Sequence, residues 1–107
     1  MAGMFHCCSN IEHLDLSSFD TTNVTNMAYM FSECRNLESL THHLNTINVE
    51  SMRDMFNWCT SLVALDASSF ITSKVIDMSE MFRACPMIEL KLQFDTSNVT
   101  NMERMFA

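Results

Sequence analysis

The chain has 107 residues, 48% of them apolar, which is the length and composition of one globular domain. Its net charge of −7 and its few, scattered Lys and Arg residues argue against a nucleic-acid partner, which requires clustered basic side chains. No apolar run is long enough to cross a bilayer, and the first residues lack a signal-peptide profile, so either the chain is not exported or an upstream part is missing.

One pattern, Met-x-x-Met-Phe followed in most copies by x-x-Cys, recurs along the whole chain with a period of 24 to 26 residues. A self-similar period of this length is typical of a repeat array. We therefore predict a single solenoid array, and expect it to be an excerpt of a longer one. Its repeats would span residues 1–26, 27–51, 52–77 and 78–101, with a partial repeat at 102–107.

The repeated pattern favours a short helix, because its apolar residues fall at i, i+3, i+4 and i+7 and would share one helical face. A good N-cap residue precedes the first Met of each later copy. These four residues are Asn26, Ser51, Asp77 and Asn101. The sequence thus predicts a two-turn capped helix in each repeat, stabilised by packing against its neighbours.

Between the helices, each repeat carries a short alternating piece, at residues 14–16, 40–42, 65–67 and 90–92. Alternation of this kind predicts a short strand with one buried face. The outward residues would be Asp15, Thr41, Asp66 and Lys91. A polar bend follows, with Thr at its second place in every repeat: Thr21, Thr46, Thr72 and Thr96. We expect any partner-binding surface to use one of these two rows, because stacking presents equivalent positions side by side.

The repeated cysteines argue against a disulfide framework. Cys8, Cys34, Cys59 and Cys85 occupy the same inward phase of the repeat, which favours a buried column of free thiols, whereas Cys7 should point outward.

Catalytic, metal and cofactor chemistry find little support in the sequence. The Met pairs have the soft ligands that copper(I) prefers, but the Phe that follows at helical spacing indicates core packing instead. The histidines share no zinc-type spacing with the cysteines; they are His6, His13, His42 and His43. Cys7 adjoins His6 but lacks an orienting third group. We interpret His42 as a position at which the core is packed less tightly. The sequence therefore predicts no enzyme, no cofactor and no metal site.

Two stretches resemble a known family. Residues 14–31 read LDLSSFDTTNVTNMAYMF, and residues 94–102 repeat FDTSNVTNM. They resemble the BspA-like leucine-rich repeat, also described as a bacterial surface protein repeat. The resemblance implies a leucine-rich-repeat-type solenoid, found on surfaces of bacteria and mycoplasmas, with roles in adhesion and protein binding and no general catalytic residues.

Together these observations predict an α/β repeat fold, a leucine-rich-repeat-like solenoid of about four coils, each with a short strand, a polar bend and a short capped helix. The first functional hypothesis is a non-catalytic protein-binding or adhesion module at the cell surface or outside the cell. The alternative is a structural scaffold subunit inside a large intracellular assembly. In either case we expect protein partners to cover the open ends of the array, since uncovered ends expose core side chains.

Overall fold

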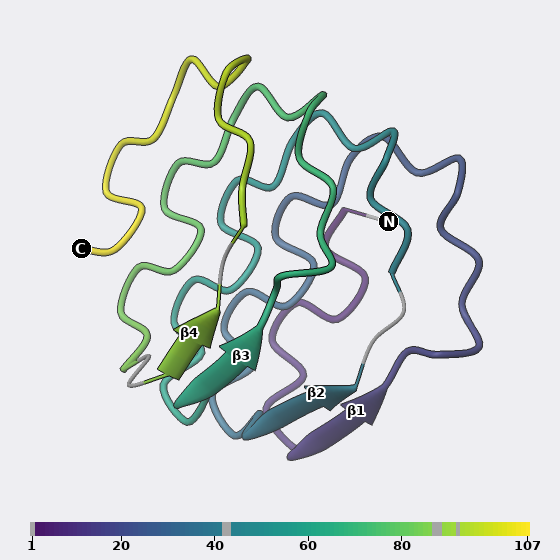
Figure 1. The fold of residues 1–107 in the computed structure, drawn as a ribbon. Coiled ribbons are helices and arrows are strands. Elements are labelled where there is room, and N and C mark those ends of the chain that lie inside the picture. Colours follow the sequence, from purple (N-terminus) through teal and green to yellow (C-terminus); the bar gives the residue numbers. More distant parts are fainter. Residues whose placement is uncertain (1, 42–43, 87–88, 92) are drawn as a thin grey trace.

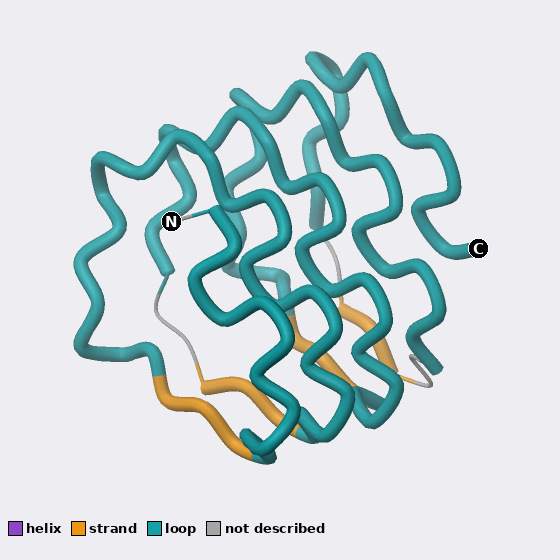
Figure 2. The backbone as a smooth tube through the Cα atoms, turned by 180° about the vertical axis from the view of Figure 1, so that it is seen from behind, coloured by secondary structure: helices purple, strands orange, loops and turns teal. Residues whose placement is uncertain are grey.

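The structure, a computed structural model, describes residues 2–41, 44–86, 89–91 and 93–107. Within these residues it contains four short strands and no helix (Figure 2). The strands are β1 (His13–Asp15), β2 (Ser39–Thr41), β3 (Ala64–Asp66) and β4 (Glu89–Lys91). Each begins one residue before the piece that alternation predicts, and the predicted residues His42 and Leu92 lie outside the described part.

The segments expected to be helical are pairs of tight turns. In the second repeat, the amide of Met30 donates to the carbonyl of Met27, and the amide of Cys34 donates to that of Phe31. These bonds span three residues, whereas an α-helix requires four. Asn26 does accept from a backbone amide, but from Ala28 two residues on, which is the geometry of an Asx turn. The side chain of Asn26 therefore accepts a backbone hydrogen bond, as a helix cap does, but this bond begins a turn and not a helix.

The backbone amides of these turns alternate between two kinds of partner. The amide of Met30 bonds within its own repeat, while the amides of Tyr29 and Phe31 donate to Arg53 and Met55 of the next repeat, each at 2.9 Å. The third and fourth repeats show the same alternation. A helix would satisfy all of these groups within one segment. The turns instead direct every second amide to a neighbouring repeat, so adjacent repeats are joined by hydrogen bonds.

Positive φ angles make this alternation possible. Two positions in the turn pair adopt the left-handed region, and in the second repeat they are Tyr29 (φ 60°) and Glu33 (φ 60°). Equivalent positions in the other repeats do the same: Gly3, Cys7, Asp54, Trp58, Glu80, Ala84 and Arg104. Eight of these nine residues are not glycine, although non-glycine residues rarely adopt this conformation. Left-handed residues break the helical path every four residues.

Successive repeats lie side by side in sequence order (Figure 1). β1 pairs in parallel with β2, with Leu14 opposite Leu40, and β3 pairs in parallel with β4. β2 and β3 also lie next to each other without forming a ladder. The residues expected to be helix caps form single parallel bridges from Asn26 to Ser51, Ser51 to Asp77 and Asp77 to Asn101. Equivalent positions of neighbouring repeats are therefore paired at the strands and again just before the turn pairs.

The core consists of columns of equivalent apolar side chains. Phe rings of five repeats form one stack, with centroid separations of 5.3 to 5.6 Å: Phe5, Phe31, Phe56, Phe82 and Phe106. The methionines of the three middle copies are fully buried: Met27, Met30, Met52, Met55, Met78 and Met81. The apolar spacing thus identifies these core residues correctly, although the backbone between them is not helical.

The predicted fold class, an α/β leucine-rich-repeat-like solenoid with a capped helix in each coil, is therefore wrong. The described residues form a compact body of turns and short strands with a radius of gyration of 12.4 Å. The mismatch arises because the spacing i, i+3, i+4, i+7 fits two consecutive four-residue turns as well as it fits a helix. In the described part of the chain, no helix has the length and apolar character required to span a membrane.

Candidate functional site

The strands carry a row of exposed side chains, Asp15, Thr41, Asp66 and Lys91, which we call the strand row. Asp15 lies opposite Thr41, and Asp66 lies opposite Lys91, in the register of the two parallel pairs. Paired strands are about 4.8 Å apart, so the two side chains of each pair lie close together, and β2 and β3 are adjacent without a ladder between the pairs.

A hollow lies beside the strand row at β3 and β4. It has a volume of about 170 Å³ and is lined by Ala64, Leu65, Asp66 and Lys91. Ligand pockets for drug-sized molecules usually measure about 300–1,000 Å³. The hollow is therefore of a size for one side chain, and it offers a carboxylate, an ammonium group and apolar surface together.

Local hydrogen bonds orient two carboxylates of the strand row. An oxygen of Asp15 accepts from the amide of Ser17 at 2.9 Å, and an oxygen of Asp66 accepts from the amide of Ser68 at 3.0 Å. The hydroxyl of Ser68 also donates to Asp66. Because these turns follow directly on the strands, the carboxylates are held beside the strand ends.

The second predicted row, that of the bend threonines, is mostly buried. Thr21, Thr46 and Thr72 are 1 to 2% exposed, and Thr96 is exposed. The hydroxyl of Thr46 donates to the carbonyl of Ile71 at 2.9 Å and accepts from the amide of Ile71 at 2.7 Å. Thr21 and Thr72 make the same pair of bonds to the repeat that follows each of them. These three side chains join neighbouring repeats and are not accessible to a partner. We therefore do not include them in the candidate site.

The cysteines are free thiols, as the repeat phase predicts. Cys34 and Cys59 are buried, Cys8 and Cys85 are half-buried, and Cys7 is exposed. The thiol of Cys59 donates to the carbonyl of Phe31 in the preceding repeat at 3.0 Å, and Cys34 and Cys85 make equivalent bonds. Burial raises the pKa of Cys34 to about 11, and a hydrogen bond with Cys85 together with burial raises the pKa of Cys59. Cys34 and Cys59 thus contribute to packing and are poor nucleophiles at neutral pH, whereas the hydrogen bond with Cys59 lowers the pKa of Cys85.

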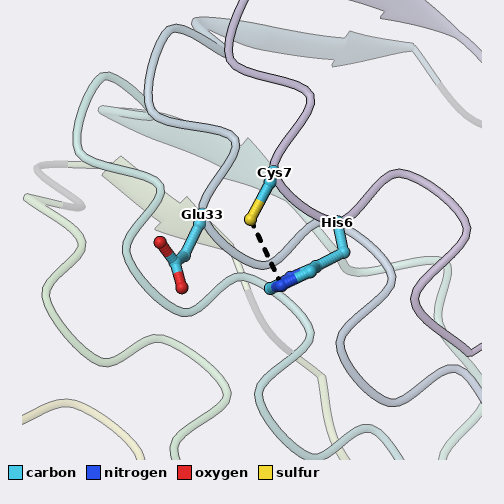
Figure 3. Close-up of side chains that lie close together, drawn as sticks. All are labelled: His6, Cys7 and Glu33. Carbon is cyan, nitrogen blue, oxygen red and sulfur yellow. Dashed lines mark hydrogen bonds between the residues drawn. The ribbon is translucent and has the colours of Figure 1, made fainter.

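The fold brings together a third group that sequence reasoning did not connect. The ligand atoms of His6, Cys7 and Glu33 all lie within 4.8 Å of one another (Figure 3). The sulfur of Cys7 is 3.2 Å from Nε2 of His6, and Glu33 reaches them from the next repeat. The signal was present in the period, because Glu33 follows Cys7 by one repeat and so occupies the equivalent position.

Among the described residues, the remaining histidine, His13, takes no part in this group. Nδ1 of His13 is 2.6 Å from the hydroxyl of Ser39, and its other ring nitrogen lies 3.9 Å from the carboxylate of Glu38. Both contacts are on the exposed side of the first strand pair. His42 and His43 lie outside the described residues, so the expected relaxation of the core at His42 stays a prediction.

Comparison with known proteins places the chain in one family. A family model described as "Mycoplasma protein of unknown function, DUF285" matches residues 1–107. Neither a curated protein nor a solved structure matches the chain.

Proposed function

We propose that this chain, which belongs to the DUF285 family of mycoplasma proteins of unknown function, is a non-catalytic module that binds other proteins through its strand row. The observation that carries the proposal is the parallel register, which aligns Asp15 with Thr41 and Asp66 with Lys91 on one exposed edge of the molecule. A row of equivalent exposed positions is the kind of extended surface with which repeat proteins bind their partners.

The chemistry of the strand row favours a polypeptide over other ligands. The row combines two carboxylates, a hydroxyl and one ammonium group, so it provides both hydrogen-bond donors and acceptors along its length. The hollow beside Asp66 and Lys91 accommodates one side chain of the partner. The net charge of −7 disfavours nucleic acid and the anionic surface of a membrane.

The resemblance of residues 14–31 to BspA-like repeats supports adhesion as the purpose of this binding, and a cell-surface or extracellular location. The alternative, a scaffold subunit in an intracellular assembly, is supported by the five free thiols, because reducing compartments preserve thiols. Coverage of the outer repeats by protein partners stays a prediction under both readings.

Binding through the strand row is tested with a matched pair of double variants. The double variant Asp66→Ala with Lys91→Ala removes one acid and one base from the row. The control, Glu103→Ala with Arg104→Ala, removes another exposed acid–base pair, whose charged atoms are 3.8 Å apart. Proteins that crosslink to the wild-type chain should be lost with the first variant and kept with the second. Equal loss or equal retention would contradict the proposed surface.

The location is tested on intact cells that produce the chain. A membrane-impermeant amine reagent should label the exposed Lys74 and Lys91 if the chain is a surface module. Labelling only after the cells are lysed would support the intracellular scaffold instead.

A further inference from the structure

The group formed by His6, Cys7 and Glu33 has the composition of a metal site. We propose that these three residues bind one Zn²⁺ ion through the sulfur of Cys7, Nε2 of His6 and the carboxylate of Glu33. The inference is independent of the protein-binding function, since the group lies on the turn pairs and not on the strand row.

The backbone hydrogen bonds between the first two repeats hold the three residues together. The amide of Phe5 donates to Met30 and the amide of Cys7 donates to Ser32, both at 2.9 Å. Cys7 is thereby held beside the residue that follows Ser32, which is Glu33. The spacing between the two ligands is thus set by a main-chain ladder and not by two mobile loops.

Backbone conformation directs the two side chains to the same place. Cys7 has a φ of 59° and Glu33 a φ of 60°, so both leave the backbone from a left-handed residue at the same position of the repeat. His6 precedes Cys7 within a turn in which its amide donates to Gly3 at 3.0 Å. Figure 3 shows the imidazole and the thiol facing each other, with the carboxylate of Glu33 close by.

The ligand types fit zinc best among the common metals. Zn²⁺ binds thiolate, imidazole and carboxylate in tetrahedral geometry, whereas Mg²⁺ and Ca²⁺ prefer all-oxygen sites. Zinc bond lengths imply ligand separations of roughly 3.3–3.8 Å. Cys7 and His6 are already 3.2 Å apart, and the remaining distances do not exceed 4.8 Å. His6 and Cys7 are exposed and Glu33 is half-buried, so small side-chain rotations close the site.

Binding replaces the thiol proton by the metal. The Cys7 S–H bond breaks, its proton passes to the solvent, and bonds from zinc to sulfur, nitrogen and oxygen form. Three protein ligands leave a fourth position for water. Glu33 also accepts a bond from Arg35 at 3.2 Å, so the guanidinium competes with the metal for this carboxylate.

The test is a Co²⁺ titration of the full chain, since a Co²⁺–thiolate bond produces a charge-transfer absorption band. We expect one Co²⁺ per chain, and bleaching of the band by Zn²⁺, which binds such sites more tightly. The Cys7→Ser variant should lose the band. His6→Gln and Glu33→Gln should each weaken binding at least tenfold. Zn²⁺ should also raise the melting temperature of the wild type but not that of Cys7→Ser.

Two controls separate the site from adventitious binding. Cys8→Ser removes the neighbouring half-buried thiol and should leave the titration unchanged. Arg35→Gln breaks the same ion pair as Glu33→Gln but keeps the ligand, so it should leave metal affinity unchanged or raise it. A band retained in Cys7→Ser, the lack of any band, or wild-type affinity in both His6→Gln and Glu33→Gln would each overturn the proposal.

Discussion

Left-handed residues determine the local path of this chain. Tyr29, Glu33 and their equivalents turn the backbone every four residues, and this rotation directs alternate amides to the next repeat. A non-glycine residue in this region costs roughly 1–2 kcal/mol. The inter-repeat hydrogen bonds and the buried columns must offset that strain, so relief of strain at one site should be measurable.

Ala84 offers the cleanest measurement of this strain, because its φ is 58° and its side chain is small. Ala84→Gly should raise the free energy of unfolding by about 0.5–1 kcal/mol, since glycine adopts positive φ without steric cost. The control, Ala64→Gly in the exposed part of β3, should lower it by a similar amount, because glycine weakens a strand. Urea denaturation measures both changes. A loss of stability in both variants would show that the left-handed turn is not strained.

The buried thiols link stability to alkaline pH. Burial raises the pKa of Cys34 to about 11, so the folded state retains a proton that the unfolded state releases. Unfolding then releases protons above the ordinary thiol pKa, and the free energy of unfolding must fall as pH rises beyond about 8.5. Below that pH, the stabilising contribution of the buried thiol to the free energy of unfolding is fully present.

Thermal melts between pH 7 and pH 10 measure this linkage. Cys34→Ala should be less stable at pH 7 but should show a shallower alkaline decline than the wild type. Identical slopes in the two proteins would contradict the raised pKa.

At the scale of the element, side-chain hydrogen bonds join each repeat to the next in addition to the backbone hydrogen bonds. The hydroxyl of Thr46 bonds to both main-chain groups of Ile71, and it is 1% exposed. The bends are therefore joined by a side chain at the point where no strand pairing occurs. The thiol-to-carbonyl bonds from Cys34, Cys59 and Cys85 have the same role at the end of the turn pairs.

Thr46→Val keeps the shape of the side chain but removes both hydrogen bonds to Ile71. An unsatisfied buried polar group costs about 1–3 kcal/mol, so we expect a loss of about 2 kcal/mol in the free energy of unfolding. Thr46→Ser should keep most of the stability, and Thr96→Val, at the exposed equivalent position, should change it by less than about 0.5 kcal/mol. Chemical denaturation of the three variants makes the comparison. Equal effects at Thr46 and Thr96 would show that the hydroxyl does not join the repeats.

At the scale of the whole molecule, the stack of Phe rings connects all of the repeats. Phe56 is fully buried and stacks on Phe31 at 5.3 Å and on Phe82 at 5.6 Å. Phe106 is 60% exposed, and among the described residues it stacks against Phe82. Stability should therefore be concentrated in the middle repeats.

Alanine substitution along the Phe stack tests this distribution. Phe56→Ala should cost about 3–5 kcal/mol, the usual range for a buried Phe. Phe106→Ala should cost about 1 kcal/mol or less, because most of its surface is already in water. Melting temperatures and denaturant midpoints report both values. A loss at Phe106 as large as that at Phe56 would show that the outer repeat is as tightly packed as the centre.

Much of the core was predictable, because the period and the apolar spacing are properties of the chain alone. The burial of Met55, Phe56 and Cys59 follows from their recurrence at one phase of the repeat. The exposure of the strand row follows from alternation around Leu14, Leu40 and Leu65. The free thiols follow from the equivalence of their positions.

The sequence by itself determined how often the pattern repeats and which apolar side chains of the middle repeats face inward. Only the tertiary structure decided the backbone conformation of the repeated Met-x-x-Met-Phe segments. A helix and a pair of tight turns with left-handed residues both place residues i, i+3, i+4 and i+7 on the same side, so the spacing does not distinguish them. The tertiary structure also decided the roles of Thr46 and Glu33. The hydroxyl of Thr46 bonds to the next repeat, and the carboxylate of Glu33 lies near Cys7 of the preceding repeat. Both contacts join residues that are one full period apart in the sequence. Rules based on local sequence patterns do not describe such contacts.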